Sequence, residues 1–394
     1  MEYFYFEQEP SLCRASFAIT HLGQLQSSEN SLWLDANSFY QQPTYQEAAL
    51  GELIAKRELR AVNRAHPRWR ELCQQQKPQP PFTVNLLACG DVGSTLLIGL
   101  KLLAQNTIRK IGIYDINPAL CQRWEFELNQ ICAPSAELTS PVVSIITKDQ
   151  LFDCDIFVFC ATAGVPALND KSDVRLAQYQ NNAAIIKEYA LLAREKHFQG
   201  LFAVVSDPVD LLCQTVLLES NKDPNGNFDG LGLFPEQIEG YGLGVMHARA
   251  RYYAAKDPTL ASYLDEGRAY GPHGQGLIIA NSVANYNDEK SKRLTELALT
   301  ANIKAREYGF KPYVAPALSS GALSLLATLR GEWHYSSTYL GGIFMGARNR
   351  RCSAGLEIEA LPLSQQLKQR IEETTEILKS LNNSIIGLSS DTGR

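Results

Sequence analysis

The segment TVNLLACGDVGSTLLIGLKLLAQ, residues 83–105, decides the fold. It reads as a short apolar strand, a glycine turn and an apolar helix, and Ala88 stands where the dinucleotide fingerprint has its first glycine. Gly90 would let the backbone approach a pyrophosphate at the positive end of the helix, and Gly93 would let that helix pack closely on the strand. The turn therefore predicts a dinucleotide-binding site at Gly90, Asp91, Val92 and Gly93.

An acidic residue follows at the expected distance. Asp115 ends the second apolar strand, IGIYD, 22 residues beyond Gly93. A carboxylate there can accept hydrogen bonds from the adenosine ribose hydroxyls and repels a 2′-phosphate. The alternative is a helix N-cap, because N-P-A-L follows and Asp is common at that position. Because the strand, the glycine turn and the acidic residue follow one another at the expected spacing, we expect NAD as the cofactor, in preference to NADP.

The alternation of strands and helices continues beyond this unit. RKIGIYD (109–115), DCDIFVFCAT (153–162) and LFAVVSDP (201–208) are apolar strands separated by helical segments. Such strands are typical of a parallel sheet covered on both faces, the doubly wound α/β architecture. Residues 290–312 and 356–382 are expected to form helices.

The first 80 residues differ from the rest. Residues 47–76 alternate apolar and charged residues at helical spacing and end in the Pro-rich linker KPQPPF. We expect a partly helical extension of unknown role. The basic residues from Lys56 to Arg70 could form an interaction arm, but a solvated helix face is favoured.

Composition limits the function classes. The chain has 394 residues with 45% hydrophobic and 20% charged, the profile of a globular protein. A net charge of −5 gives no reason to expect nucleic acid or an anionic membrane as partner. There is no apolar run of about 20 residues and no signal-peptide pattern, so a cytoplasmic protein is expected. Nine cysteines without C-x-x-C spacing suggest free thiols, ahead of disulfides or a metal site.

Five segments along the chain form a recognisable series: GDVGST, TAG (162–164), RLAQYQNNAAII (175–186), VSDPVDLL (205–212) and GPHGQG (271–276). Together, in this order and spacing, they resemble the lactate/malate dehydrogenase superfamily. The resemblance covers residues 83 to about 385. It implies an NAD-binding Rossmann domain (83–215) followed by an α+β substrate domain (216–390), after the extension 1–80. It also implies cofactor contacts from Thr162, Ala163, Gly164 and Asp207, and a homodimer or homotetramer.

The resemblance assigns three catalytic or substrate-binding positions. His273 lies in G-P-H-G-Q, which looks like the family's catalytic histidine segment, and its reference pKa suits proton exchange near neutrality. Arg249, in M-H-A-R-A-R-Y, maps to the arginine that binds the substrate carboxylate, with Arg251 on the opposite helix face. Arg175 matches the mobile-loop arginine that polarises the carbonyl on closure. The alternatives are a structural role for His273, surface salt bridges for Arg249 and Arg251, and a solvated side chain for Arg175.

Two substitutions alter the expected catalytic set. The aspartate that supports the histidine maps to Met246, which cannot stabilise an imidazolium. The family's Asn in V-S-N-P maps to Asp207, which would either repel an anionic substrate or supply the missing charge to His273. The second possibility is a hypothesis in which Asp207 joins His273 and Arg175 in catalysis.

The substrate loop also departs from the family. Where malate enzymes have an arginine and lactate enzymes a glutamine, this chain has Pro166, Ala167 and Leu168. A second substrate carboxylate would lose its usual partner there. We therefore expect a 2-oxo or 2-hydroxy acid with an apolar or bulky side chain, bound by Arg249 and Leu168. Thr338 in SSTYLGG matches a pocket-lining position.

The leading interpretation is an NAD-dependent 2-hydroxyacid oxidoreductase that is neither a standard lactate nor a standard malate enzyme. The alternative is a catalytically impaired NAD-binding protein with a regulatory or interaction role that uses residues 1–80. A third interpretation, an NAD- and metal-dependent glycosidase on a related fold, would need a Cys and His pair to bind the metal. No such pair can be identified in the sequence, so no metal is expected.

Overall fold

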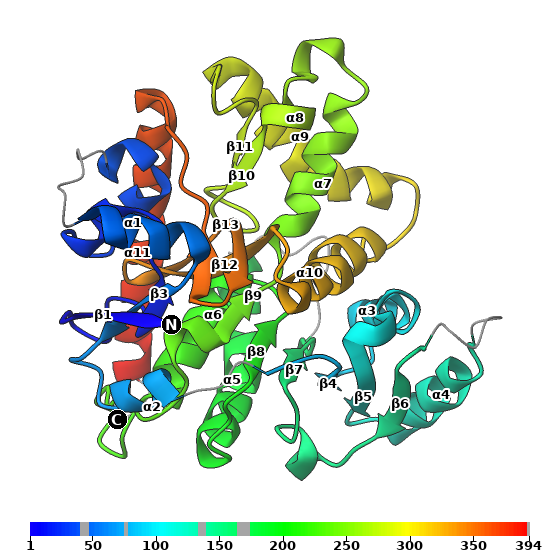
Figure 1. The fold of residues 1–394 in the computed structure, drawn as a ribbon. Helices are drawn as coiled ribbons and strands as arrows, with labels where there is room; N and C mark the ends of the chain where they lie inside the picture. Colours follow the sequence, from blue (N-terminus) through cyan, green and yellow to red (C-terminus); the bar gives the residue numbers. More distant parts are fainter. Residues whose placement is uncertain (40–46, 75–77, 133–138, 164–173, 392–394) are drawn as a thin grey trace.

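The computed structural model describes residues 1–39, 47–74, 78–132, 139–163 and 174–391. One nine-stranded sheet organises the chain after residue 80, in the order β14-β13-β12-β9-β8-β7-β4-β5-β6 (Figure 1). Its strands are β4 (Phe82–Leu87), β5 (Ile108–Tyr114), β6 (Val142–Ile145), β7 (Ile156–Phe159), β8 (Leu201–Val204), β9 (Ile238–Gly240), β12 (His334–Leu340), β13 (Ile343–Cys352) and β14 (Gly355–Ile358).

The strands from β4 to β9 are parallel and wind in two directions. From β4 the chain adds β5 and β6 on one side, and then β7, β8 and β9 on the other. This confirms the predicted doubly wound sheet. The order reverses between β4 and β7, and in such sheets the crevice outside the carboxyl ends of these strands is where ligands bind.

Apolar side chains from alternate strand positions pack on both faces of the sheet. On one face Leu86 and Val158 join a core with α3 (Asp91–Leu103), α4 (Pro118–Asn129) and α10 (Ser324–Arg330). On the other face Leu87 and Phe157 join a core with α5 (Val174–Glu195) and α6 (Val209–Ser220). Burial on both faces explains why these strands are continuously apolar rather than alternating.

The C-terminal part surrounds the antiparallel strands with helices. Its other elements are α7 (Leu243–Ala254), α8 (Tyr263–Glu266), the hairpin β10 (Arg268–Tyr270) and β11 (Ile278–Ala280), α9 (Asp288–Glu307), the π-helix η8 (Pro316–Leu323) and α11 (Gln365–Asp391). The helix expected over 356–382 was wrong at its start, because 355–358 form strand β14. The sixth parallel strand, β9, follows residue 215, so a cut there would divide the parallel sheet, and the domain division stays a prediction.

The N-terminal segment forms its own small sheet. Strands β1 (Glu2–Phe6), β3 (Leu59–Asn63) and β2 (Ser16–Ala18) pair in that order, with helices α1 (Glu47–Lys56) and α2 (Trp69–Gln74) on either side of β3 in the chain. The continuous helical pattern expected over 47–76 was therefore wrong in its middle. Leu59, Ala61 and Val62 are buried when β3 pairs with both neighbours, and this pairing prevails over the local periodicity.

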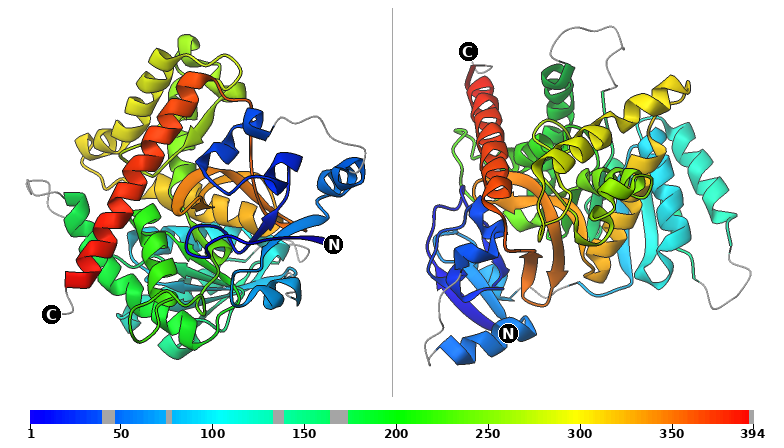
Figure 2. Two further views of the ribbon diagram at one scale, coloured as in Figure 1. Left: turned by 90° about the vertical axis from the view of Figure 1, so that its left-hand side faces the viewer. Right: turned by 90° about the horizontal axis from the view of Figure 1, so that it is seen from above.

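The small sheet packs against the C-terminal half of the molecule (Figure 2). Phe17, Trp33 and Leu59 share one hydrophobic core with Ile343 of β13 and Leu367 of α11. The segment therefore shares a core with the strands and helix that close the molecule.

The cysteines all lie in described residues, and none of the nine forms a disulfide. Most are inaccessible; complete burial raises the pKa of the Cys160 thiol to about 12, so its reactive thiolate is rare at neutral pH. Among the described helices, none combines the length and apolar character needed to cross a membrane.

Candidate functional site

The turn between β4 and α3 has the geometry expected of a phosphate-binding turn. Helix α3 begins at Asp91, and Gly90 in extended conformation is its N-cap. A Cβ built on Gly93 would lie 2.0 Å from the carbonyl oxygen of Ala88, so only glycine fits there. A Cβ on Gly90 would meet no atom within 4 Å, which leaves open space before the helix N-terminus. Ala88 itself has a φ of 75°, the left-handed region that favours glycine.

Asp115 lies beside this turn. Its Oδ2 accepts the backbone N–H of Cys89 at 2.7 Å, and its Oδ1 accepts that of Asn117 at 2.8 Å. The N-cap of α4 is Asn117, whose side chain accepts the backbone N–H of Ala119. The alternative that Asp115 caps this helix is therefore wrong. Its carboxylate instead joins the end of β5 to the phosphate turn.

Asp91 and Val92 face different surroundings. The carboxylate of Asp91 pairs with Lys311 at 2.8 Å, and both side chains are exposed. Val92 lines the cavity described below.

A buried amide connects the segments that follow β7 and β8. Asn182 of α5 is fully buried; its Oδ1 accepts the backbone N–H of Ala163 at 2.8 Å, and its Nδ2 donates to the backbone carbonyl of Asp207 at 2.7 Å. It thereby ties Thr162 and Ala163 to the turn that carries Asp207. Asn182 lies within the motif RLAQYQNNAAII, but nothing in the local pattern indicates this bridging role.

The central pair of the site is His273 and Asp207. Asp207 precedes α6, and His273 lies in the loop between β10 and β11. The imidazole Nδ1 lies 3.0 Å from Asp207 Oδ1. Its Nε2 is buried and has no hydrogen-bond partner within the described part of the chain. With Nδ1 donating to the carboxylate, Nε2 of the neutral ring carries the lone pair and is available to exchange a proton.

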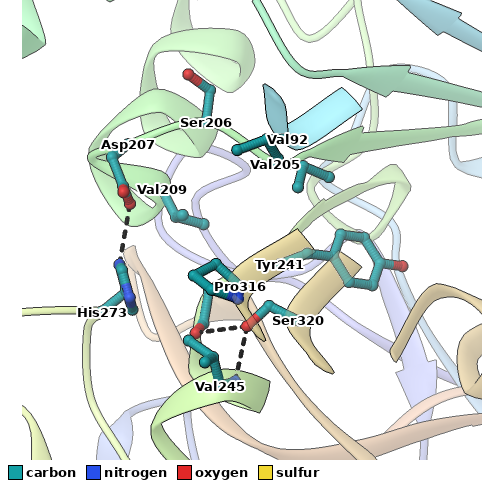
Figure 3. Close-up of a pocket in the computed structure, with 11 residues that line it drawn as sticks. Val92, Val205, Ser206, Asp207, Val209, Tyr241, Val245, His273, Pro316 and Ser320 are labelled. Atoms are coloured by element: carbon teal, nitrogen blue, oxygen red, sulfur yellow. Dashed lines mark hydrogen bonds and ion pairs between the residues drawn. The ribbon is translucent and has the colours of Figure 1, made fainter. Parts of the chain in front are cut away.

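Both residues line a cavity that is open to solvent on one side, with about 330 Å³ of empty space including that opening (Figure 3). The cavity adjoins the carboxyl ends of the parallel strands and the start of α3. Its lining is mostly apolar, and the residues other than His273 and Asp207 are Val92, Val205, Ser206, Val209, Tyr241, Gly242, Val245, Pro316 and Ser320. Ser320 donates to the carbonyl of Gly242 and accepts the N–H of Val245, each at 2.8 Å, and so joins the π-helix to the start of α7.

Met246 and Arg249 lie on α7. Met246 is buried among apolar side chains that include Leu277, so it contributes packing and no charge. Arg249 donates through Nη1 to the carbonyl of Ala298 at 3.2 Å and approaches Met246 Sδ at 3.7 Å. No carboxylate in the described residues forms an ion pair with it. Burial lowers the pKa of Arg249, and the nearby charge of Asp207 acts in the opposite direction.

The remaining predicted positions are less defined. Gly164 and Leu168 lie outside the described residues. Arg175 falls in the first turn of α5, and its side chain is also outside the described part. Thr338 is buried in β12 and is not among the residues that line the cavity. Arg251 donates to the backbone carbonyl of Leu264 at 2.7 Å.

Comparison with known proteins identifies the relatives of this chain. Residues 83–229 match the family described as lactate/malate dehydrogenase, NAD binding domain. An L-lactate dehydrogenase of Mesomycoplasma hyopneumoniae is 24% identical over 331 residues, spanning 76% of this chain and 97% of that protein. The minor L-lactate dehydrogenase of Enterococcus mundtii superposes with a TM-score of 0.61 at 19% identity, over 77% of this chain and 98% of its own. Malate dehydrogenase from Archaeoglobus fulgidus in complex with NADH superposes with a TM-score of 0.59 at 18% sequence identity. The superposition covers 77% of this chain and 99% of that protein.

NAD is accordingly the cofactor, and the observed turn fits it. The open space at Gly90 and the close contact at Gly93 are what a pyrophosphate at the N-terminus of α3 requires. The carboxylate of Asp115 stands at the end of the neighbouring strand, where a ribose binds in doubly wound sheets.

Proposed function

Since the chain belongs to the lactate/malate dehydrogenase superfamily, we propose that it transfers a hydride between NAD(H) and a 2-hydroxy/2-oxo acid. The observation that carries the proposal is the contact of His273 Nδ1 with Asp207, which leaves a buried Nε2 with no protein partner among the described residues. A histidine in this state can exchange a proton with a substrate oxygen.

His273 and Asp207 divide the proton chemistry between them. When the hydroxy acid is oxidised, Nε2 takes the hydroxyl proton, and when the oxo acid is reduced, the imidazolium returns it. NAD, when bound, supplies the hydride acceptor or donor. Asp207 holds the ring through Nδ1 and stabilises the positive charge while the proton is on Nε2. It thus takes the role that Met246 cannot fill.

The arginines and the substrate loop define the acid that binds. A guanidinium that is partly buried and has no ion pair among the described residues, as at Arg249, suits a substrate carboxylate, which its planar fork can bind through two hydrogen bonds. Arg175 would polarise the substrate carbonyl on closure of its loop. The apolar Leu168 and its neighbours favour an apolar or bulky side chain over a second carboxylate. Thr338 stays a weaker candidate for the substrate pocket.

The alternative is an NAD-binding protein without turnover, which the loss of the family's aspartate at Met246 favours. Incubation of the full chain with NADH and a panel of 2-oxo acids separates the two. The panel should include acids with small, branched, aromatic and carboxylate side chains. We expect NADH oxidation with an apolar member, lost in His273→Ala. Tight NADH binding with no turnover across the panel would support the alternative.

Light scattering on the same sample tests the proposed homodimer or homotetramer.

The role of Asp207 can be tested separately. In Asp207→Asn the ring keeps a neighbour of the same shape but loses the charge that stabilises the imidazolium. We expect kcat to fall by about 100-fold or more, the usual scale of an acid–base contribution. The same change at the exposed Asp265 is the control and should leave kcat unchanged. If Asp207→Asn alone has little effect, Asp207 has no part in the proton transfer.

A further inference from the structure

A second aspartate holds the backbone of His273. Asp210 lies in the first turn of α6, three residues after Asp207, and its side chain is buried. Its Oδ2 accepts the backbone N–H of His273 at 3.3 Å, and its Oδ1 accepts the hydroxyl of Ser337 at 2.6 Å. The carboxylate therefore joins α6 to the loop that carries the histidine and to strand β12.

The backbone around this contact is crowded. A Cβ on Gly242, at the start of α7, would lie 2.8 Å from the Cβ of His273. A Cβ on Gly240, which pairs with Ser337 across the sheet, would lie 3.1 Å from the Cβ of that serine. With no room for side chains at either glycine, the loop, β9 and β12 are in direct contact. The loop that carries His273 is thus held against the neighbouring strands and the start of α7. The carboxylate of Asp210 adds polar contacts between this loop and β12.

The charge of Asp210 is unusual for its surroundings. Burial raises the pKa of its carboxyl to about 6, against the hydrogen bond from Ser337, so it is ionised at neutral pH. No lysine or arginine within the described ranges forms an ion pair with it. The titratable groups around it are His273, the Asp207 that contacts the same histidine, the Cys213 thiol one turn along α6, and Glu239 of β9. Glu239 itself forms an ion pair with Arg351. A buried carboxylate without a cationic partner is costly to fold, and such groups gather at functional sites.

Resting on the function proposed above, we propose that Asp210 is a positioning residue for His273. Its ionised carboxylate fixes the histidine backbone through Oδ2 and adds a second negative charge beside the imidazole. Together with Asp207 it supplies the support that Met246 cannot. The imidazolium is the state that gains from both charges, so Asp210 raises the proton affinity of Nε2 through the field rather than by touching substrate.

The proposal gives the two groups a coupled titration. When the pH falls through about 6, Asp210 takes up a proton and its charge is lost. The imidazolium of His273 favours the ionised form of Asp210, and the ionised form of Asp210 favours the imidazolium by the same free energy. A variant without the charge of Asp210 is therefore expected to hold the imidazole proton less tightly.

The experiment is an NMR titration of the histidine ring protons in the full chain, with the His273 signal assigned by its loss in His273→Ala. Asp210→Asn retains the shape of the side chain: its amide oxygen can accept the backbone N–H of His273, and its NH2 can donate to the hydroxyl of Ser337. In this variant we expect the His273 midpoint to fall by about 0.5 to 1 pH unit, the scale of one lost neighbouring charge. Asp265→Asn should leave the midpoint within about 0.2 of the original. An unchanged midpoint in Asp210→Asn would overturn the proposal.

This readout does not depend on turnover, so it stands even if no 2-oxo acid is reduced. If an acid is reduced, the pH profile of kcat should move down with the NMR midpoint in Asp210→Asn, whereas a purely structural loss would reduce kcat without moving the profile. Ser337→Ala provides a second variant should Asp210→Asn fail to fold. Loss of its hydrogen bond raises the pKa of Asp210 further, so the His273 midpoint should fall in the same direction, by less. A rise or no movement there would contradict the proposal.

Discussion

The imidazole Nδ1 of His273 lies 3.0 Å from Asp207 Oδ1, whereas Met246, where the family resemblance predicts the supporting aspartate, is buried among apolar side chains. A carboxylate on either side of the ring can hold Nδ1 and favour the imidazolium. Position 207 offers it from the turn after β8, at the end of a parallel strand. Position 246 would place it within the buried face of α7, next to the guanidinium of Arg249. The two substitutions are therefore consistent with relocation of one charge.

Asp115 leads to a prediction about cofactor choice. Its carboxylate is fixed by two backbone N–H groups, from Cys89 and Asn117, and cannot easily turn away from a 2′-phosphate. We expect NADH to bind about tenfold or more tighter than NADPH, as for two like charges a few ångströms apart near water. Asp115→Ser should narrow the ratio, while Asp153→Ser, at another exposed position of this domain, should not. Fluorescence titration of both cofactors measures the ratio; NADPH binding as tightly as NADH would contradict the prediction.

At the residue scale, the charged groups of the site could be predicted from the sequence, but the neutral polar side chains that hydrogen-bond to them could not. His273 and Asp207 were predicted from their motifs, and their contact was a stated hypothesis. Asn182 and Ser337 were missed because an amide or a hydroxyl gains its role only from partners 25 and 127 residues away, Asp207 and Asp210. No local pattern records which buried polar group will meet which. The side chains of Arg175 and Leu168 lie outside the described residues, so their roles stay predictions.

The turn from β4 to α3 leads to a prediction at the scale of an element. Ala88 has a φ of 75°, a conformation that costs an L residue about 1 kcal/mol or more. In Ala88→Gly this strain is removed, against a smaller entropic cost in the unfolded chain. We expect the free energy of unfolding to rise by up to about 1 kcal/mol in urea titrations. Ala55→Gly, at an exposed position of α1, should lower it by about 1 kcal/mol. Destabilisation by both substitutions would show that the turn is unstrained.

The helices and strands were predicted correctly where burial on both faces of the sheet agrees with the local sequence pattern. The prediction failed where pairing with a neighbouring strand prevails over that pattern. The parallel strands are continuously apolar, so they were recognised without knowledge of their neighbours. Strand β3 lies within residues 47–76, where apolar and charged residues follow helical spacing. Its pairing with β1 and β2, and not the local pattern, makes it a strand. Strand β14 was likewise assigned to a helix because its hairpin partner β13 is what defines it.

At the scale of the whole molecule, three basic residues of the N-terminal segment bind other parts of the chain, whereas Lys56, Arg64 and Arg70 are exposed. Arg57 pairs with Glu357 of β14, and Arg60 donates to the backbone carbonyls of Ser353 and Ala354. Arg68 donates to the carbonyl of Gly232. The solvated helix face expected here was wrong for these three residues, since their partners lie on distant parts of the chain. The segment is thus attached by charge as well as by its shared hydrophobic core.

Arg57 tests this attachment in the complete chain. Burial opposes ionisation of Glu357, but the hydrogen bonds from Arg57 and Arg350 hold its pKa below the ordinary value. In Arg57→Met one of these partners is lost, and we expect the free energy of unfolding to fall by about 1–3 kcal/mol near pH 7. Lys56→Met, an exposed neighbour with only a 3.9 Å contact to Glu52, should cost less than about 0.5 kcal/mol.

The pH dependence of the same variant distinguishes a lost ion pair from lost packing. A carboxylate whose pKa is lowered in the folded state stabilises the protein above its unfolded pKa of about 4.5, and this stability disappears as the pH falls below that value. The difference between the wild-type protein and Arg57→Met should therefore be constant from pH 8 to about pH 5 and shrink below about 4.5. Urea unfolding across this range measures it. A difference that remains constant even below the lowered folded-state pKa of Glu357 would assign the effect to the aliphatic part of the arginine. Equal stability of the wild-type protein and Arg57→Met at pH 7 would mean that the N-terminal segment is held by its apolar core alone.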